Sequence, residues 1–125
     1  MTSRFNLEFI NQLLNKEYIE AGLYLIATPL GNLSDITIRS LNILASSSVV
    51  YCEDTRVSKK LITKYGIKCN LRPFHEHNSI KKIPNIINEL KEEKIISLIS
   101  DAGTPLISDP GFNLVRECRR CHLNV

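Results

Sequence analysis

Apolar residues occur along this chain in two alternating patterns: short continuous runs and longer stretches with helical spacing. A continuous apolar run suits a strand that is buried on both faces of a parallel sheet. Such runs lie at residues 23–27, 49–52 and 95–99, and a further extended segment is predicted at residues 70–75. Because helical stretches separate these segments, the pattern predicts an α/β fold, a parallel sheet with helices on both faces.

The residues at the ends of the helical stretches predict where the helices begin. Ser34 or Asp35 is expected to cap the first helix, and Thr55 the second. Pro84 is expected in the first turn of the third helix, because a proline deeper in a helix clashes with the preceding turn. That helix should therefore begin near Lys82. A fourth helix is predicted after residue 111.

The hydrophobic pattern also predicts the domain organisation. Residues 1–21 form an N-terminal extension that contains a short amphipathic helix at residues 5–16. Residues 22–125 form one domain, and its last residues, 123–125, are expected to begin another strand.

Composition narrows the class of protein. The chain has 125 residues, 43% of them hydrophobic, and a formal net charge of +3. This composition excludes a disordered or coiled-coil protein, and no apolar run approaches the roughly 20 residues of a membrane span. The mild positive charge is compatible with an RNA partner without requiring one. The first 20 residues lack the apolar stretch of a signal peptide, so a cytoplasmic protein with reduced cysteines is expected.

Three predicted loops follow buried strands, where ligands of open α/β sheets bind. The first, at residues 28–32, joins a strand to a helix through a turn with Pro29 and Gly31. Backbone N–H groups at such a helix start attract anions, although an ordinary tight turn has the same residues. The loop matches neither the dinucleotide nor the ATP phosphate-loop pattern.

The loop at residues 100–111 is longer than most strand-to-helix connections, and loops of this length in compact domains are often functional. Gly103 permits close approach of a ligand to the backbone. Asp101, Thr104 and Ser108 offer hydrogen bonds to a polar small molecule, and Pro105 stiffens the path. The alternative is a stiff connection without a ligand.

The loop at residues 53–56 places Glu53 and Asp54 beside Arg56. Adjacent carboxylates can serve as a general base, but Asp54 can equally cap a helix and pair with Arg56. His75 and His77 lie on the same side of an extended segment, as a base or a metal pair would. Lysines 59, 60, 64, 81 and 82 are able to contact phosphates or simply form solvated helix faces.

The four cysteines do not predict a metal site. The sequence Cys118-x-x-Cys121-His122 has haem-attachment spacing, but both cysteines fall on the apolar stripe of the predicted last helix, where small buried residues explain them. A zinc site that includes Cys52 and Cys69 remains the weaker alternative. No metal is expected.

Four motifs together resemble the ribosomal RNA small-subunit methyltransferase I family, which belongs to the tetrapyrrole (corrin/porphyrin) methylase superfamily. They are the segment from Gly22 to Thr37, Cys52-Glu-Asp-Thr-Arg56, His75-Glu-His-Asn78 and the segment from Ser100 to Gly111. The resemblance covers residues 22–125, and the last motif is the most specific.

The resemblance implies S-adenosylmethionine-dependent 2′-O-methylation of a cytidine ribose in small-subunit (16S) rRNA. It further implies a homodimer that acts on rRNA, with no membrane or DNA partner, and a second, C-terminal domain beyond this chain. Methyl transfer requires chiefly positioning of the acceptor oxygen and removal of its proton.

Site residues carried over by the resemblance fall into three groups. The donor-binding residues would be Thr28, Pro29, Leu30, Gly31, Asp101, Ala102, Gly103, Thr104, Pro105 and Ser108. Arg56, Lys59 and Asn78 would contact the nucleotide, and Glu53, Asp54 or His75 would assist deprotonation. The sequence departs from the family at Ser79, where members commonly carry an acid.

Two other functions are compatible with the same residues. One is methylation of a porphyrin or corrin macrocycle, against which the rRNA-type loop at residues 100–111 argues. The other is a non-catalytic binding or dimerisation module, because the family donor site is shared with a second domain and this chain alone is expected to be inactive.

Overall fold

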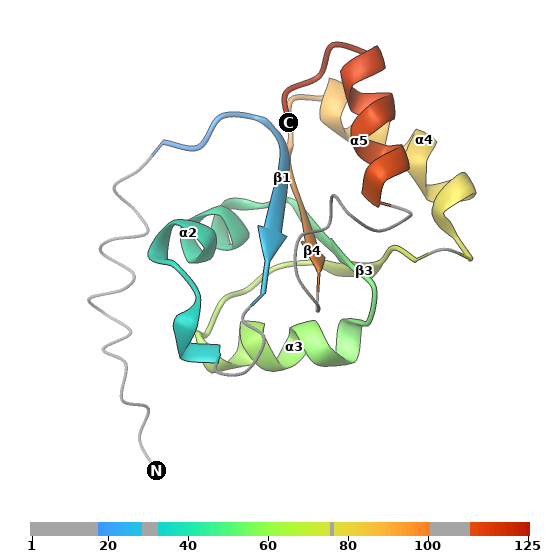
Figure 1. Ribbon diagram of the computed structural model, residues 1–125. Coiled ribbons are helices and arrows are strands. Elements are labelled where there is room, and N and C mark those ends of the chain that lie inside the picture. Colours follow the sequence, from blue (N-terminus) through green and yellow to red (C-terminus); the bar gives the residue numbers. More distant parts are fainter. Residues whose placement is uncertain (1–17, 29–32, 76, 101–110) are drawn as a thin grey trace.

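Four parallel strands form one sheet in the order β1-β4-β2-β3 (Figure 1). The computed structural model describes residues 18–28, 33–75, 77–100 and 111–125. The strands are β1 (Gly22–Ala27), β2 (Val49–Cys52), β3 (Leu71–Pro73) and β4 (Ile95–Ser100). The helices are η1 (Leu33–Asp35), α2 (Ile38–Ser46), α3 (Thr55–Lys64), α4 (Ser79–Lys91) and α5 (Gly111–Arg120).

Helices cover both faces of the sheet, as the sequence pattern predicts. Side chains of α2 and α3 pack on one face, where they form one apolar cluster with Ile26, Val50 and Ile99. Side chains of α4 and α5 pack on the other face, in a second cluster with Leu23, Tyr51 and Leu98. Figure 1 shows the two helix pairs on different sides of β1 and β4.

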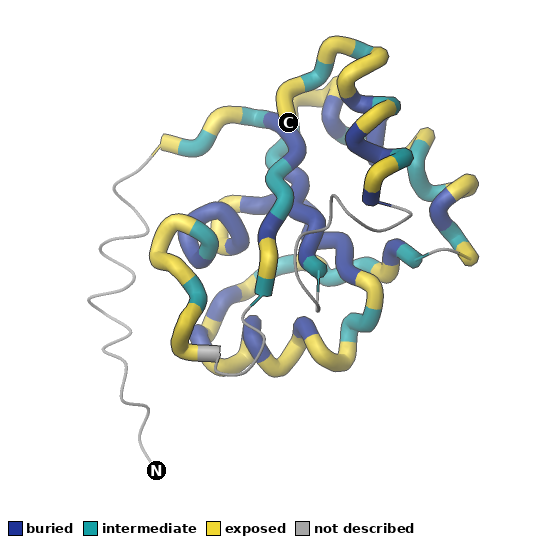
Figure 2. Tube along the Cα trace, in the orientation of Figure 1, coloured by how far each residue is buried: buried dark blue, intermediate teal, exposed yellow. Residues whose placement is uncertain are grey.

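Alternate residues of β2 explain its continuous apolar run. Val49 and Tyr51 belong to the cluster beneath α4 and α5, whereas Val50 and Cys52 belong to the cluster beneath α2 and α3. All four side chains are buried, and the buried tube in Figure 2 follows this strand through the centre of the molecule. A strand with apolar neighbours on both faces has no solvated side, so its sequence does not alternate.

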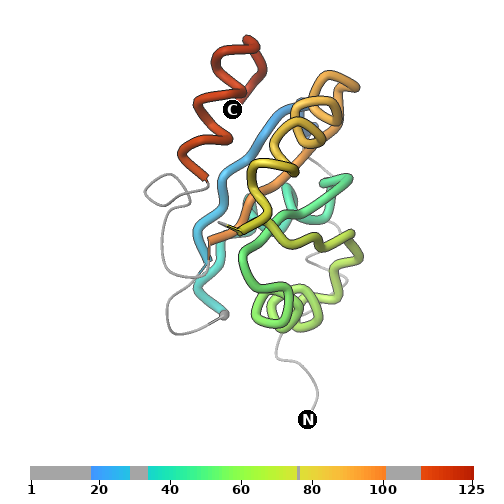
Figure 3. The backbone as a smooth tube through the Cα atoms, turned by 90° about the vertical axis from the view of Figure 1, so that its right-hand side faces the viewer, coloured from blue at the N-terminus to red at the C-terminus, as the bar shows by residue number. Residues whose placement is uncertain are grey.

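The register places the carboxyl ends of the strands at one edge. Ala27 of β1 lies opposite Ser100 of β4, and Cys52 of β2 lies opposite both Ile99 and Pro73. The carboxyl ends of the four strands therefore lie at the same edge of the sheet. Figures 1 and 3 both place α3 at this end and the C-terminus at the other.

The predicted cap of α2 and the predicted start of α4 are wrong, whereas one of the two caps that the sequence offers for α3 is confirmed. Thr37 rather than Ser34 or Asp35 caps α2, because its hydroxyl accepts a hydrogen bond from the Ser40 N–H at 3.0 Å. The residues at 33–35 form the separate turn η1. Asp54 rather than Thr55 caps α3, since its carboxylate accepts the Arg56 N–H.

Helix α4 begins at Ser79 rather than near Lys82, and Pro84 lies inside it. Proline removes one helical hydrogen bond, to the carbonyl of the residue four positions earlier. That residue is Ile80, which is 87% exposed. The turn before the proline forms nevertheless, because the Lys82 N–H donates to the Asn78 carbonyl at 3.0 Å and Ser79 is buried.

Residues 123–125 are not a strand in the structure, although they lie beside β1. The Leu23 N–H donates to the Asn124 carbonyl at 2.9 Å, and the Asn124 side chain donates to the Ala21 carbonyl. Gly22 has a φ of +152°, and a Cβ there would come within 2.9 Å of the Asn124 Cβ. Only glycine allows this close passage.

No helix among the described residues is long and apolar enough to cross a bilayer.

A polar network ties α4 to the two strands whose loops form the site described below. Tyr51 of β2 donates its hydroxyl to Glu89 of α4 at 2.6 Å, and Arg72 of β3 lies 3.7 Å from the same carboxylate. Tyr51 is 1% exposed, and burial together with the Glu89 carboxylate raises its pKa to about 12. The network fixes α4 against β2 and β3.

Tyr51→Phe is expected to cost roughly 1–2 kcal/mol at neutral pH, because Glu89 loses a partly buried donor. The pKa of Tyr51 in the folded protein lies above its ordinary value of 10.0, so the phenol's contribution to folding stability is complete below pH 10 and is lost as the pH rises toward 12. Between these values the wild type should lose up to about 1.4 kcal/mol per pH unit more than the variant. Urea unfolding of both proteins from pH 7 to 11 measures the difference, and parallel profiles would contradict it.

Candidate functional site

The crevice between the ends of β2 and β3 has a simple topological cause. The chain leaves β2 into α3 on one face of the sheet and leaves β3 toward α4 on the other face. Diverging connections at neighbouring strand ends leave a crevice at the carboxyl edge, where open α/β sheets bind ligands. A hollow of about 450 Å³ occupies this position. It is lined by Glu53, Asp54, Thr55, Arg56, Pro73, His75 and His77; we call it the strand-end hollow.

The structure brings together two motifs that are about 20 residues apart in sequence. Glu53, Asp54 and Arg56 come from the start of α3, and His75 comes from the segment after β3. Lys59 and Asn78, the other predicted nucleotide contacts, do not line this hollow. Lys59 lines a neighbouring hollow, which Arg56 also borders.

The Asp54 carboxylate is engaged in hydrogen bonds at the start of α3. One carboxylate oxygen accepts the Arg56 N–H at 2.9 Å and the guanidinium Nε at 3.2 Å, and the other accepts Nη2 at 3.1 Å. The Arg56 side chain lowers the pKa of this exposed carboxyl. A carboxylate that is stabilised in its charged form is a weak proton acceptor, so the helix-cap interpretation describes this geometry.

Glu53 differs from its neighbour. It is exposed at the mouth of the hollow and makes no hydrogen bond or ion pair with any described residue. Its carboxylate is therefore accessible to a ligand in the hollow.

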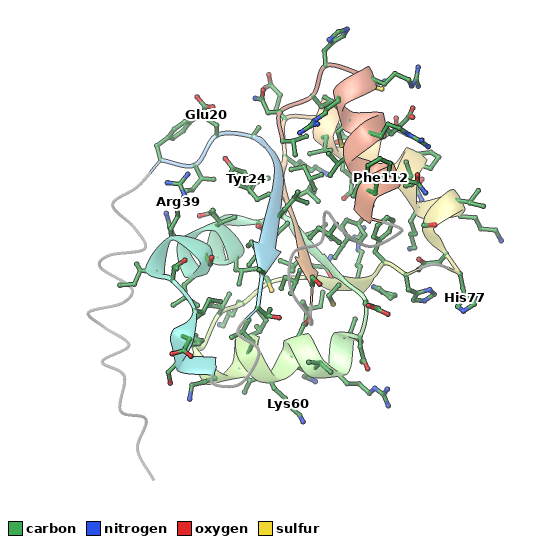
Figure 4. All side chains as sticks on the ribbon, viewed as in Figure 1. Glu20, Tyr24, Arg39, Lys60, His77 and Phe112 are labelled. Carbon is green, nitrogen blue, oxygen red and sulfur yellow. The ribbon has the colours of Figure 1, made fainter. Side chains whose placement is uncertain are left out.

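His75 is held by the segment that follows it. The Asn78 side chain accepts the His75 N–H at 2.9 Å and donates to the Pro73 carbonyl at 3.1 Å. The Nδ1 atom of His75 is buried and has no hydrogen-bond partner among the described residues. The rings of His75 and His77 meet edge to face at 5.8 Å, and Figure 4 shows His77 at the beginning of α4. The Asn78 side chain thus holds the backbone of the segment that carries His75.

Two lining residues, Thr55 and Pro73, were not among the predicted site residues, and His77 was predicted only as the partner of His75 in a base or metal pair. Thr55 and Pro73 lie at an element boundary next to predicted residues, which is the signal that would have included them. His77 alternates with His75 along the chain, so the pairing of the two rings follows from their spacing.

Of the predicted donor-binding residues, only Thr28 lies within the described residues. Its N–H and its hydroxyl both donate to the Ser100 carbonyl, so the ends of β1 and β4 are joined at this point. The remaining predictions, Pro29 to Gly31 and Asp101 to Ser108, lie outside the described residues. The two donor loops nevertheless begin side by side, from adjacent strands whose following helices α2 and α5 cover opposite faces. Open α/β sheets bind ligands at strand ends whose connections diverge in this way, so the donor site stays a prediction for this position.

The cysteines are placed as the core interpretation predicts. Cys118 is fully buried in the cluster beneath α4 and α5, and burial raises its pKa to about 11. Cys52 is buried on the opposite face of the sheet. These two thiols therefore cannot share one zinc ion. Within the described ranges, no three His, Cys, Asp or Glu side chains are grouped as metal ligands, and the four cysteines are free.

Comparison with known proteins identifies the same relationship that the motifs indicate. A family model described as tetrapyrrole (corrin/porphyrin) methylases matches residues 22–125. Curated relatives carry the name ribosomal RNA small subunit methyltransferase I. The protein of Mesorhizobium japonicum is 52% identical over 79% of this chain and 34% of its own length. The protein of Rickettsia prowazekii is 48% identical over 81% of this chain and 36% of its own length. The protein of Thermotoga maritima is 51% identical over 78% of this chain and 44% of its own length.

The chain thus spans about a third of the length of the first two of these relatives. The described fold, a parallel sheet covered on both faces, agrees with the matched family. The remaining residues of these relatives are not matched by this chain.

Proposed function

This chain belongs to the tetrapyrrole (corrin/porphyrin) methylase family, and from that premise we propose that it carries part of an S-adenosylmethionine-dependent methyltransferase. The substrate is small-subunit rRNA, and the acceptor is the 2′-hydroxyl of a cytidine ribose. The single observation that carries the proposal is the strand-end hollow, which unites the Cys52–Arg56 and His75–Asn78 motifs at the edge of the donor loops. A homodimer in the cytoplasm, completed by a second domain, accompanies this function.

The donor loops would hold S-adenosylmethionine at the ends of β1 and β4. Bound there, it supplies an electrophilic methyl group on a sulfonium sulfur. Thr28 secures the first loop to Ser100, and Gly103 with its neighbours provides backbone amides without a bulky side chain. The chain's own residues must then hold the ribose and accept the proton of its hydroxyl.

Glu53 is the residue that we assign to proton removal. It follows β2, which pairs directly with β4, whereas His75 follows β3, one strand farther from the donor loops. Neighbouring strands are about 4.8 Å apart, so Glu53 begins closer to the donor by roughly that distance. Asp54 is bound to Arg56. We assign His75, whose backbone N–H donates to the Asn78 side chain, to contact with the nucleotide.

Glu53→Gln is expected to lower the methyl-transfer rate by roughly 10²- to 10⁴-fold, the usual contribution of a general base, without changing RNA affinity. Asp54→Asn keeps the side-chain oxygen that caps α3, so we expect a loss of less than about tenfold. Single-turnover rates for the two variants in the complete gene product measure both effects. An equal loss in the two variants would overturn the assignment of Glu53.

The alternative substrate, a porphyrin or corrin macrocycle, is tested in the same assay. The complete gene product is incubated with methyl-labelled S-adenosylmethionine and either small ribosomal subunits or a porphyrinoid. Label in the RNA supports the proposal. Label in the macrocycle alone favours the other branch of the family, and absence of label from both would leave a non-catalytic binding module.

A further inference from the structure

The positive charge of the chain is concentrated next to the strand-end hollow. Residues 55–75 contain no acidic residue. The basic residues in this range are Arg56, Lys59, Lys60, Lys64, Lys68 and Arg72. Arg56 pairs with Asp54 and Arg72 with Glu89, but Lys59 and Lys68 form no ion pair with a described residue. The overall charge of +3 therefore conceals a local surface that attracts anions.

A second hollow, of about 650 Å³, lies along this basic surface between α3 and β3. It is lined by Thr55, Arg56, Lys59, Ile62, Thr63, Ile67, Lys68, Cys69 and Leu71, and we call it the α3 groove. Its floor is apolar, because Ile62 and Ile67 are nearly buried and Leu71 and Cys69 are half-buried. Lys59 and Lys68 are exposed at its rim. Figure 4 shows that Lys60 points away from the body of the protein, on the outer side of α3.

The α3 groove borders the strand-end hollow. Thr55 and Arg56 line both, so a polymer with one unit in the strand-end hollow passes over these residues into the groove. A basic rim above an apolar floor suits single-stranded RNA, since lysines contact phosphates and an apolar surface contacts the face of a base or ribose. None of the groove's lining residues is acidic.

We propose that the α3 groove binds single-stranded RNA flanking the nucleotide to be methylated, with phosphates at Lys59 and Lys68 and a base on the apolar floor. The proposal rests on the proposed function, because the groove extends the same substrate site. It adds a binding path with Lys68 and Cys69, which the resemblance does not assign.

The test compares Lys59→Gln/Lys68→Gln with Lys81→Gln/Lys82→Gln, which removes the same charge from α4, outside both hollows. Binding of a short single-stranded RNA is measured across a salt series with the complete gene product. The groove variant should bind roughly tenfold or more weakly at low salt, and its salt slope should fall by about 1.4, for two lost phosphate contacts. S-adenosylmethionine affinity should not change, and the α4 variant should match the wild type.

A second measurement probes the floor of the groove. Cys69 and Cys121 are both half-buried free thiols, but only Cys69 lines the groove. Bound single-stranded RNA should slow alkylation of Cys69 and leave Cys121 unaffected. Unchanged alkylation of Cys69, or protection by polyglutamate but not by RNA, would overturn the proposal and favour an acidic protein partner.

The outcomes separate the two proposals. If the wild-type protein methylates rRNA but the groove variant binds RNA as the α4 variant does, the proposed function stands and the groove proposal is refuted. If the wild-type protein neither binds RNA nor methylates it, the proposed function itself is refuted.

Discussion

Phe74→Ala is expected to destabilise the protein by about 3–5 kcal/mol, the usual cost of removing a buried phenyl ring. Phe74 follows β3, is 2% exposed and packs in the cluster beneath α4 and α5. Its ring meets that of Tyr51 edge to face at 6.2 Å. The cavity would open directly beneath the polar network that fixes α4, so little of the lost contact can be recovered.

The matched control is Phe112→Ala on α5, which removes the same side chain from a site that is 51% exposed. Its ring contacts the Arg116 guanidinium at 5.9 Å, an exposed cation–π pair worth about 0.5–1 kcal/mol. Urea unfolding at neutral pH compares the two variants. Similar losses would show that Phe74 does not hold the core. Because Phe74 precedes His75, we also expect methyl transfer to fall with stability in the first variant alone.

Gly103→Val is expected to weaken S-adenosylmethionine binding by roughly a hundredfold or more without unfolding the protein. The reason is steric: a branched side chain would fill the space in which the backbone approaches the donor. Gly103 itself lies outside the described residues, but its loop begins at Ser100, where the Thr28 contact joins it to the first donor loop. The prediction therefore tests whether the donor binds at the ends of β1 and β4.

Calorimetry with S-adenosylmethionine and the complete gene product measures this effect, and a thermal melt reports folding. Ala45→Val is the control, because it introduces the same side chain at an exposed position of α2. Wild-type donor affinity in Gly103→Val would refute the donor-site assignment. A variant with a lowered melting temperature and lost binding would instead assign Gly103 to the fold.

The sequence predicts the sheet and its two covered faces because its strands are buried on both sides. Val49 to Cys52 is apolar at every position, and a run of this kind between amphipathic helices has few other solutions. The predicted family agrees with the family match over residues 22–125.

The helix starts were harder to predict, since they depend on competition between neighbouring polar residues. Thr37 caps α2 in place of Ser34 or Asp35. For α3 the sequence offered both Asp54 and Thr55, and Asp54 is the cap. The start of α4 was predicted too late because Pro84 was placed in the first turn, whereas the helix contains a full turn before it, closed by the hydrogen bond from the Lys82 N–H to the Asn78 carbonyl.

The site was predictable as a set of motifs but not as a surface. The sequence left Asp54 open between base and helix cap, and only the three contacts with Arg56 describe the cap. The α3 groove could not be predicted, because its floor combines α3 with residues 67–71 and depends on how the two pack. Spacing along the chain contains no information on such a surface.

Nucleoside mass spectrometry of rRNA is the most direct test of the proposed 2′-O-methylation of cytidine. Small subunits that lack the cytidine ribose methyl group are incubated with the complete gene product and S-adenosylmethionine, and the rRNA is digested to nucleosides. We expect one new 2′-O-methylcytidine per subunit, a yield that Glu53→Gln reduces and Asp54→Asn largely retains. A methyl group on a base, or no methylated nucleoside at all, would contradict it.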